Sequence, residues 1–494
     1  MATPTNLGLA NRDTTTTPPA PPNRTWAFAA LCLGFFAVIL DTTIVNVALP
    51  AIEGNLHGTV TDLQWVANGY TIALAALLLT CGTLSDRHGA KRAYGYGLSI
   101  FVFGSLACGL APDLAILVAG RVVQGVGAAL LMPASLALII HAYPERAERT
   151  KAVAIWASFA GAGTAIGPVL GGFLVGTIGW RSIFFVNLPI GIVAISLLIA
   201  NAIETPVVRR SVDVAGQMFG FAALGALAFA LTEAGSYGWT SPLVAGSLGS
   251  AFLFGLALIV VERQASAPML SPGLLRERTF MAASGVGFLL NFGIYGQVFV
   301  LSLYFQHVRH DSALTTGLLL LPFAAMTMLA PPLTGRLTNR FGPRIVMVFG
   351  QLLCAAGTAV LAVSSPDTDY LFLAPGLVGL GLGMAATMPS LTAAAILAAP
   401  RKYAGIASGV LNASRQVGGV LGVALLGTLV ADPTSFMAGM HIALTLVSAA
   451  FVMGAALASR STKRSPVNVA NETAGSSLPI EQAPLAQIPA SSDS

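Results

Sequence analysis

Long apolar runs divide this chain, and they restrict its possible folds more than any other feature. We identify fourteen such runs of roughly 18 to 28 residues, each able to cross a hydrocarbon core about 30 Å thick as a helix. Only helices and closed barrels satisfy their own backbone hydrogen bonds in lipid. The runs lie near residues 26–49, 64–81, 96–112, 115–141, 153–177, 183–203, 214–234, 243–261, 280–304, 314–334, 345–364, 371–398, 404–430 and 437–459.

The composition agrees with a chain that lies mostly in lipid. Only 9% of the residues are charged and 55% are hydrophobic, whereas soluble domains carry about 25% charged residues. We therefore predict an all-α polytopic membrane protein. The alanine- and glycine-rich composition favours a bacterial source, and hence the plasma membrane.

The net charge of +5 does not indicate a nucleic-acid partner, because the basic residues follow the predicted membrane topology. All but four of the 25 lie in segments on one side of the membrane. The exceptions are Arg121, Arg181, Arg309 and Arg415. Cytoplasmic loops collect lysine and arginine, so both termini are expected in the cytoplasm.

The two ends of the chain and its cysteines carry little functional signal. Residues 1–25, rich in Thr and Pro, and residues 461–494, rich in Ser, Pro and Ala, are predicted to be disordered tails. The first run lacks the layout of a cleaved signal, so we expect it to be retained. The four cysteines are too scattered for a disulfide framework or a metal site, and no metal is expected.

An acidic residue, Asp41, lies deep in the first apolar run. Counted from Trp26 it is about 22 Å along a helix, slightly beyond the middle of the bilayer. A carboxylate there costs about 3 kcal/mol or more and is a functional candidate by default. Arg121 in the fourth run is its most obvious partner, and we predict that this pair couples transport to protons. A neutral, hydrogen-bonded structural Asp is the alternative.

Further polar side chains in the runs are candidates for a substrate pathway. In the first half they are Asn46, Trp65, Tyr70 and Gln124, and in the second half Asn291, Tyr295, Gln297, Asn412 and Arg415. Trp65 and Tyr70 have a second interpretation as anchors at the membrane interface. The second half contains no deep acid.

The fifth run is unusually rich in glycine. It contains Gly163, Gly167, Pro168, Gly171 and Gly172. Proline bends a membrane helix, and small residues permit close approach by a neighbouring helix. Two interpretations stay open: a hinge, or static close packing.

An internal repeat predicts the domain organisation. The loop at residues 82–92 returns at 335–344 with an offset of 253, and the fifth run returns at 405–427 with an offset of 251. Six runs occupy about 180 residues, so two additional helices fit between the halves. We predict six-helix bundles at residues 26–204 and 279–460, with a two-helix insert and its linkers at 205–278.

These features together resemble the major facilitator superfamily, and within it the fourteen-span drug:proton antiporters. The similarity covers nearly the whole chain. The motifs that carry it lie at residues 40–50, 82–92, 121–127, 163–172, 180–189 and 408–419. The second half lacks the extra acids of members that expel divalent organic cations, so export of divalent cations is not expected.

The resemblance implies roles for two of these motifs. The loop at 82–92 is expected to latch a cytoplasmic gate, and the glycine-rich fifth run is similar to the antiporter motif. Arg121 is expected to assist proton movement. The gate candidates are Gly82, Asp86, Arg87, Gly89, Arg92 and Arg340.

We therefore predict a proton-coupled antiporter that exports hydrophobic or amphiphilic organic compounds by alternating access. A single carboxylate suits neutral or weakly basic substrates best. The alternative is a proton-coupled importer, or an exporter of an endogenous metabolite. No phosphate-binding loop or catalytic motif indicates an ATP-driven pump or an enzyme. The expected partners are lipid, protons and a small organic substrate, with no cofactor, in a functional monomer.

Overall fold

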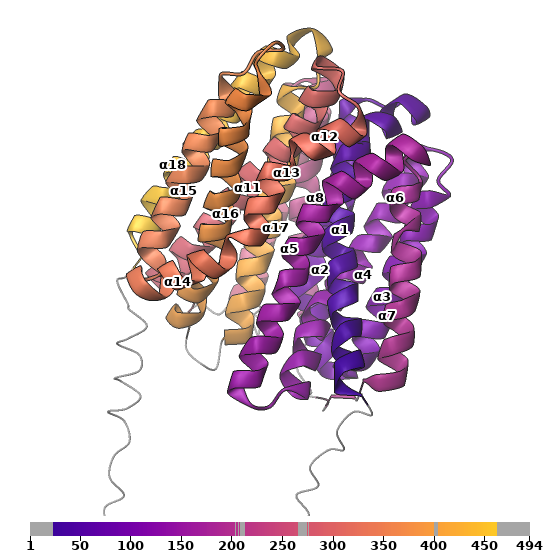
Figure 1. The fold of residues 1–494 in the computed structure, drawn as a ribbon, viewed down its shortest axis with the longest axis vertical. Coiled ribbons are helices and arrows are strands. Elements are labelled where there is room, and N and C mark those ends of the chain that lie inside the picture. Colours follow the sequence, from indigo (N-terminus) through magenta and orange to yellow (C-terminus); the bar gives the residue numbers. More distant parts are fainter. Residues whose placement is uncertain are drawn as a thin grey trace, which may run out of the picture. The chain divides into compact units, whose positions relative to one another are not determined.

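A computed structural model describes residues 23–202, 204–205, 207, 213–264, 274, 276–399 and 404–461. Every regular element in this part of the chain is a helix, which confirms the all-α membrane fold (Figure 1). Residues 1–22 and 462–494 of the two predicted tails and most of the linkers around the two-helix insert lie outside the described residues. The first helix begins at Arg24, within the predicted N-terminal tail.

The helices before residue 270 are about one to nine turns long. They are α1 (Arg24–Leu56), α2 (Val60–His88), α3 (Ala90–Gly109), α4 (Leu114–Ala142), α5 (Arg146–Thr177), α6 (Ser182–Phe185), α7 (Asn187–Asn201), α8 (Val214–Tyr237) and α9 (Pro242–Gln264).

The elements after residue 277 include both long and short helices. In chain order, these elements are α11 (Arg278–Leu303), the π-helix η1 (Tyr304–Val308), α12 (Ala313–Leu319), α13 (Leu321–Leu329), α14 (Pro331–Phe341), α15 (Pro343–Ala362), α16 (Tyr370–Ala398), α17 (Ala404–Leu429), the 3₁₀ turn η3 (Pro433–Ser435) and α18 (Phe436–Ser459).

Twelve of the fourteen predicted runs form helices long and apolar enough to cross a membrane. The two others are helical but different in kind. The run at 96–112 belongs to α3, a helix of 20 residues whose first turn contains Lys91 and Arg92. The run at 314–334 is divided into α12, α13 and α14, because prolines open α13 and α14 and proline lacks the N–H that a continuous helix needs.

The chain forms two compact units. Unit 1 comprises residues 1–269 and 301–319, and unit 2 comprises residues 270–300 and 320–494. The division falls inside α11, so its last residues, together with η1 and α12, belong to unit 1.

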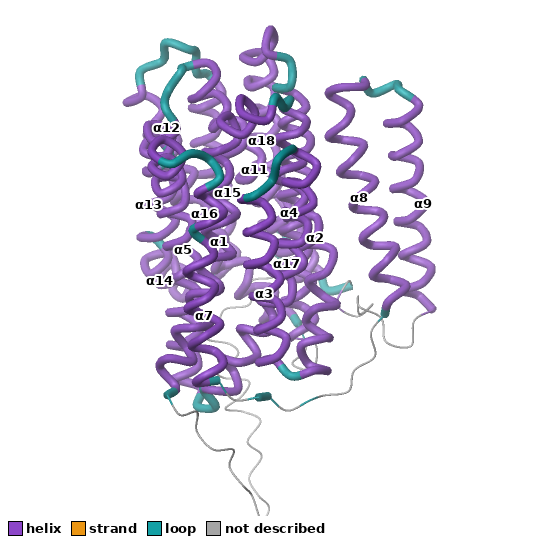
Figure 2. The backbone as a smooth tube through the Cα atoms, turned by 90° about the vertical axis from the view of Figure 1, so that its right-hand side faces the viewer, coloured by secondary structure: helices purple, strands orange, loops and turns teal. Residues whose placement is uncertain are grey.

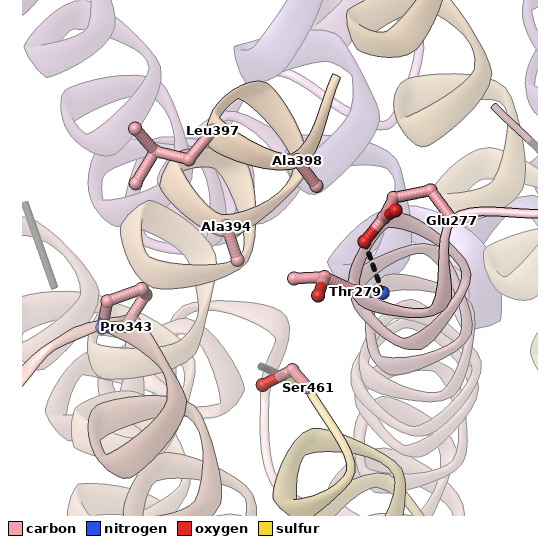
Figure 3. Close-up of a pocket in the computed structure, with 7 residues that line it drawn as sticks. All are labelled: Glu277, Thr279, Pro343, Ala394, Leu397, Ala398 and Ser461. Carbon is pink, nitrogen blue, oxygen red and sulfur yellow. Dashed lines mark hydrogen bonds between the residues drawn. The ribbon is translucent and has the colours of Figure 1, made fainter. Parts of the chain in front are cut away.

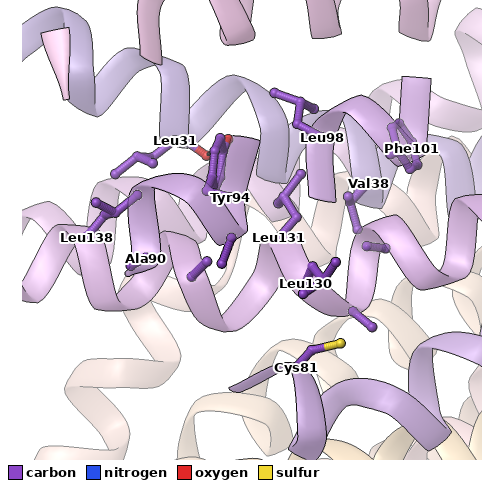
Figure 4. Close-up of a cluster of buried hydrophobic side chains, with 14 of the residues drawn as sticks. Leu31, Val38, Cys81, Ala90, Tyr94, Leu98, Phe101, Leu130, Leu131 and Leu138 are labelled. Carbon is purple, nitrogen blue, oxygen red and sulfur yellow. Dashed lines mark hydrogen bonds between the residues drawn. The ribbon is translucent and has the colours of Figure 1, made fainter. Parts of the chain in front are cut away.

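The core of unit 1 is built where α1, α3 and α4 meet (Figure 4). Small residues let α3 and α4 approach closely: a Cβ built on Gly97 would lie 2.8 Å from the carbonyl oxygen of Gly127. Tyr94 of α3 is fully buried and donates a hydrogen bond of 2.8 Å to the Ala30 carbonyl of α1. Van der Waals packing between closely approaching helices drives helix association in lipid. This packed region therefore fixes the positions of the helices that carry the polar side chains described below.

The inserted helices α8 and α9 form a hairpin within unit 1 (Figure 2). Helix α8 is attached to α2 by side-chain hydrogen bonds at several depths. Trp65 donates to Glu233 at 2.8 Å, and the hydroxyls of Thr61 and Ser236 lie 2.8 Å apart. Helix α9 packs on α8 and leaves large apolar side chains exposed, such as Phe252 at 72%, as expected for a surface that faces lipid.

The repeated loop has the same backbone geometry in both units. Gly89 has φ +90° and ψ 132°, and Gly342 has φ +82° and ψ 157°. These two residues are separated by the offset of 253 found in the sequence. Only glycine adopts this conformation readily, which explains why both turns between consecutive helices contain it.

Candidate proton-coupling site

Asp41 lies inside the unbroken helix α1 and is 0% exposed. Neighbouring polar side chains of α1 donate hydrogen bonds to backbone carbonyls of the same helix. Thr42 donates to the Val38 carbonyl at 2.9 Å, and Asn46 donates to the Thr42 carbonyl at 3.1 Å. These local bonds let a polar stretch persist within hydrocarbon. Asn46 is thus partly engaged by α1, and its place in a substrate pathway stays a prediction.

Asp41 and Arg121 form an ion pair that is sealed from solvent. Nη1 of Arg121 donates to Oδ2 of Asp41, and Arg121 is 1% exposed. A buried charge is tolerated when it is paired and its remaining hydrogen-bond groups are satisfied. The structure brings the two candidates together, whereas their part in proton coupling stays a prediction.

Two amide side chains complete the shell around the carboxylate. Gln124 and Asn187 each donate to Oδ1 of Asp41, at 2.9 and 2.8 Å. Gln124 also donates to the Ser105 hydroxyl at 2.7 Å and accepts from Arg121 at 2.7 Å. Every hydrogen-bond partner of the carboxylate among the described residues is therefore a donor, an arrangement that fits an ionised Asp41.

Arg121 has further contacts that fix its position. Its Nε donates to the Val66 carbonyl of α2 at 3.1 Å. Its guanidinium lies 4.6 Å from the ring centre of Tyr70 and 5.9 Å from that of Phe184. Tyr70 is 0% exposed, so it belongs to the wall of this site and is not an anchor at the membrane interface.

Two members of the network, Ser105 and Asn187, were not selected from the sequence. Asn187 is the first residue of α7 and follows directly after α6, so the break between these helices brings its amide to Asp41. Its place in the motif at 180–189 was the available signal. A single serine in an apolar run, such as Ser105, gives no comparable signal.

The glycines of α5 lie against the part of α1 that contains Asp41. A Cβ built on Gly163 would lie 3.1 Å from the Leu40 nitrogen, and one on Gly171 would lie 2.8 Å from Ile44 Cγ1. Gly167 approaches the same helix at Ile44. Thr43 adds a hydrogen bond of 3.2 Å to the Gly163 carbonyl. These residues therefore serve close packing, and a hinge role stays a prediction.

The other side of α5 contacts α12. A Cβ on Gly172 would lie 2.6 Å from Cα of Leu314. The Pro168 backbone in turn faces Gly317. Helix α5 is thus held between two neighbours within unit 1.

The loop motif at residues 82–92 is attached to the segment that follows α7. Nε of Arg92 lies 2.8 Å from a carboxylate oxygen of Glu204, which the sequence reasoning did not select. The Ala90 nitrogen donates to Thr205 at 2.7 Å, and Lys91 donates to the Ala202 carbonyl at 2.6 Å. This motif therefore stabilises unit 1 locally.

The remaining gate candidates differ in exposure. Asp86 is half-buried, and Arg87 and Arg340 are exposed. Gly82 packs at ordinary distance from Pro133. The guanidinium of Arg340 lies 5.3 Å from the ring centre of its neighbour Phe341. A latch formed by these residues stays a prediction.

The side chain of Trp65 contacts α8. Its indole donates to Glu233 and lies 5.8 Å from the ring centre of Phe229, both on α8. Its part in a substrate pathway stays a prediction.

The polar candidates of unit 2 lie on α11 and α17. Gln297 accepts a hydrogen bond of 3.1 Å from Thr358, and Arg415 donates to Asn412 at 3.0 Å. Asn291 is 1% exposed, and Tyr295 is half-buried. No group of three metal-binding side chains occurs among the described residues.

A small pocket occurs elsewhere in unit 2, at the start of α11 and α15 and the ends of α16 and α18 (Figure 3). Its carboxylate, Glu277, accepts from the Thr279 nitrogen at 3.5 Å and so caps α11. None of the candidate substrate residues lines this pocket.

Comparisons with known proteins identify the family of this chain. The family model described as Major Facilitator Superfamily matches residues 31–423 and 283–487. The chain is 36% identical over 430 residues to the methylenomycin A resistance protein of Bacillus subtilis (strain 168), covering 86% of this chain and 92% of that protein. It is 35% identical over 412 residues to the tetracenomycin C resistance and export protein of Streptomyces glaucescens, covering 83% and 76%.

The fold is also similar to that of a solved transporter. A POT family transporter in complex with 5-aminolevulinic acid superimposes with a TM-score of 0.68 at 14% identity, covering 90% of this chain and 97% of that one. The family match and the relatives together confirm a membrane transporter fold, with lipid and a small-molecule substrate as partners. The chain belongs to the major facilitator superfamily.

Proposed function

We propose that this protein exports hydrophobic or amphiphilic organic compounds, antibiotics among them, across the bacterial plasma membrane in exchange for protons. The observation that carries the proposal is the sealed ion pair of Asp41 and Arg121 with two amide donors on the carboxylate. The names of the relatives, which include resistance and export, support the direction of transport. Both termini lie in the cytoplasm, and the monomer is the working unit.

Protonation of Asp41 is the step that links protons to conformation. A neutral carboxyl no longer balances the charge of Arg121, and removing one partner of a buried pair costs about 3 to 5 kcal/mol. The bundle relieves that cost by changing the surroundings of the pair. Proton binding from outside and substrate binding from inside thus favour different arrangements, as alternating access requires.

The amides allow the site to hold a proton as well as to release it. The carbonyl oxygen Oδ1 of Asn187 is buried without a hydrogen-bond partner among the described residues. A carboxamide both donates and accepts, and a protonated carboxyl donates one hydrogen bond. Rotation of the Asn187 side chain would therefore turn a donor that stabilises the carboxylate into an acceptor for the carboxylic acid.

Everted membrane vesicles test the proposal, because their lumen corresponds to the outside of the cell. We expect acidification of the lumen to drive uptake of fluorescein or rhodamine 6G, two xanthene dyes of opposite charge. Asp41→Asn is expected to abolish this uptake while protein remains in the membrane. The matched control is Asp113→Asn, since Asp113 is an exposed N-cap and asparagine caps a helix equally well.

Two results would contradict the proposal. Undiminished uptake by the Asp41→Asn variant would remove the proton-coupling role of Asp41. Dye loss from the lumen on acidification would identify an importer instead.

A further inference from the structure

Arg415 differs from Arg121 in having no acidic partner. It lies about 17 Å along α17, a helix of 26 residues that is about 39 Å long. Among the described residues of unit 2 it is the one charged side chain that lies away from the ends of a helix long enough to span the membrane, and none of the ion pairs of the described residues includes it. A cation at this depth without a counter-charge is unfavourable, so a function other than packing must explain it.

The residues around Arg415 pack against the aliphatic part of its side chain and accept few hydrogen bonds from its guanidinium. A Cβ on Gly287 of α11 would lie 2.9 Å from Cγ of Arg415, so the absence of a side chain there makes room for the arginine. Nη1 donates to Asn412 at 3.0 Å, and Nε is buried without a partner among the described residues. A guanidinium has five N–H donors. Among the described residues only the bond from Nη1 to Asn412 uses one of them, so the others are available to a ligand.

A second unpaired polar group lies on the facing helix. Gly287, Asn291 and Tyr295 follow one another at intervals of four and therefore share a face of α11. The two ends of this face contact α17, because Gly287 meets Arg415 and Tyr295 meets Gly419. Asn291 lies between them, is 1% exposed, and neither atom of its amide has a partner among the described residues.

We propose that Arg415, Asn412, Asn291 and Tyr295 form the part of the substrate site that binds an acceptor oxygen of the exported compound. The preferred class is an amphiphile with a carboxylate or enolate, followed by neutral compounds with a carbonyl. This inference rests on the proposed export function and specifies its substrate.

The chemistry of the four side chains supports this class of ligand. A guanidinium pairs with a carboxylate through two parallel hydrogen bonds, and such charge-assisted bonds are roughly twice as strong as neutral ones. Arg415, Asn412 and Tyr295 are only half-buried, which leaves the guanidinium open to a ligand. The same unneutralised charge repels an organic cation, so the site also discriminates.

Equilibrium binding to the purified full-length protein tests the inference independently of proton coupling. Fluorescence polarisation is measured with fluorescein as the anionic probe and rhodamine 6G as the cationic probe. We expect fluorescein to bind more tightly than rhodamine 6G. Arg415→Gln should weaken fluorescein binding about 10- to 100-fold, the loss expected for a charge-assisted hydrogen bond, and Arg415→Glu should reverse the preference.

The controls separate binding from folding. Ser414→Ala removes a neighbouring hydrogen bond of 3.0 Å to the Ser284 carbonyl and should leave the affinity of both dyes unchanged. Should Arg415→Gln unfold, Arg415→Lys keeps the charge and loses the planar donor pair, and an intermediate affinity is expected. The melting temperature is recorded for each variant.

Two outcomes would overturn the inference. One is fluorescein affinity that does not change in Arg415→Gln or Arg415→Lys, and the other is the absence of saturable fluorescein binding to the wild type. Uptake of rhodamine 6G driven by a pH gradient, without binding of fluorescein, would refute this inference and leave the proposed function intact. Loss of proton-dependent uptake with fluorescein binding retained would refute the proposed function and leave this inference intact.

Discussion

At the scale of single residues, Asp41 is held by three side chains that all donate to it. Gln124 was predicted only as part of a substrate pathway, whereas Arg121 was expected near Asp41 from its depth and charge in the fourth run. Asn187 was not, because its position depends on the break between α6 and α7 and not on any property of a lone asparagine. The sequence therefore predicted the charges of the site but not its complete shell.

The Asn187 amide is expected to set the pH at which the transporter works. Asn187→Ala removes a hydrogen bond to the ionised carboxylate, a contribution of about 1.5 to 3 kcal/mol. The rotated amide would also bond the carboxylic acid, a neutral hydrogen bond of about 0.5 to 1.5 kcal/mol. Since 1.36 kcal/mol corresponds to one pH unit, the difference of about 1 to 1.5 kcal/mol should move the midpoint of proton-driven uptake up by about 1 unit. The sign follows because a less stabilised carboxylate binds a proton at a lower proton concentration.

The pH profile of dye uptake in everted vesicles measures this shift. Ser196→Ala is the control, since Ser196 is an exposed residue of the same helix whose hydroxyl bonds to its own backbone at 2.8 Å. An unchanged midpoint in Asn187→Ala, or an equal shift in the control, would show that the amide does not tune the carboxyl.

At the scale of helices, α5 shows what a sequence motif leaves undecided. Its glycines and Pro168 allowed both a hinge and close packing. The structure places Gly163, Gly167 and Gly171 against α1, and Gly172 against α12. The spacing of the glycines identified a face of α5 without side chains. Only the three-dimensional arrangement shows that this face contacts the residues of α1 around Asp41.

Enlarging this face should disturb the site from a distance. A side chain at Gly163 would begin 3.1 Å from the Leu40 nitrogen, so Gly163→Leu must push α5 away from α1. We expect destabilisation by about 1 to 3 kcal/mol, as for overpacked cores, together with reduced uptake. Thermal unfolding and transport measure the two effects. Gly176→Leu is the control on the same helix, because nothing lies within 4 Å of a Cβ built there.

At the scale of the whole molecule, the internal repeat was the most informative signal. It predicted two six-helix halves with an insert of two helices, and it aligned Gly89 with Gly342, whose turns have the same backbone geometry in the structure. It did not predict the division of the run at 314–334 into α12, α13 and α14. Prolines occur both within continuous helices, such as Pro168 in α5, and at helix starts, so the sequence alone does not separate these cases.

The charge of the substrate determines which gradient drives the whole cycle. If one proton enters through the single deep carboxyl and one organic anion leaves, two charges cross the membrane, about 4.6 kcal/mol per 100 mV. For a monovalent cation the charges cancel. A lumen-positive potential, set with potassium and valinomycin in everted vesicles, should therefore stimulate fluorescein uptake and leave rhodamine 6G uptake unchanged. Equal stimulation of both dyes would contradict this charge balance.

The most direct measurement is the protonation of Asp41 itself. Infrared difference spectra between the wild type and Asp41→Asn isolate the carbonyl band of the protonated carboxyl as the pH is lowered. The account predicts a band that appears on acidification and requires a lower pH when fluorescein is bound, because substrate and proton oppose each other. A carboxyl that never changes its protonation, or that titrates identically with and without the dye, would contradict it.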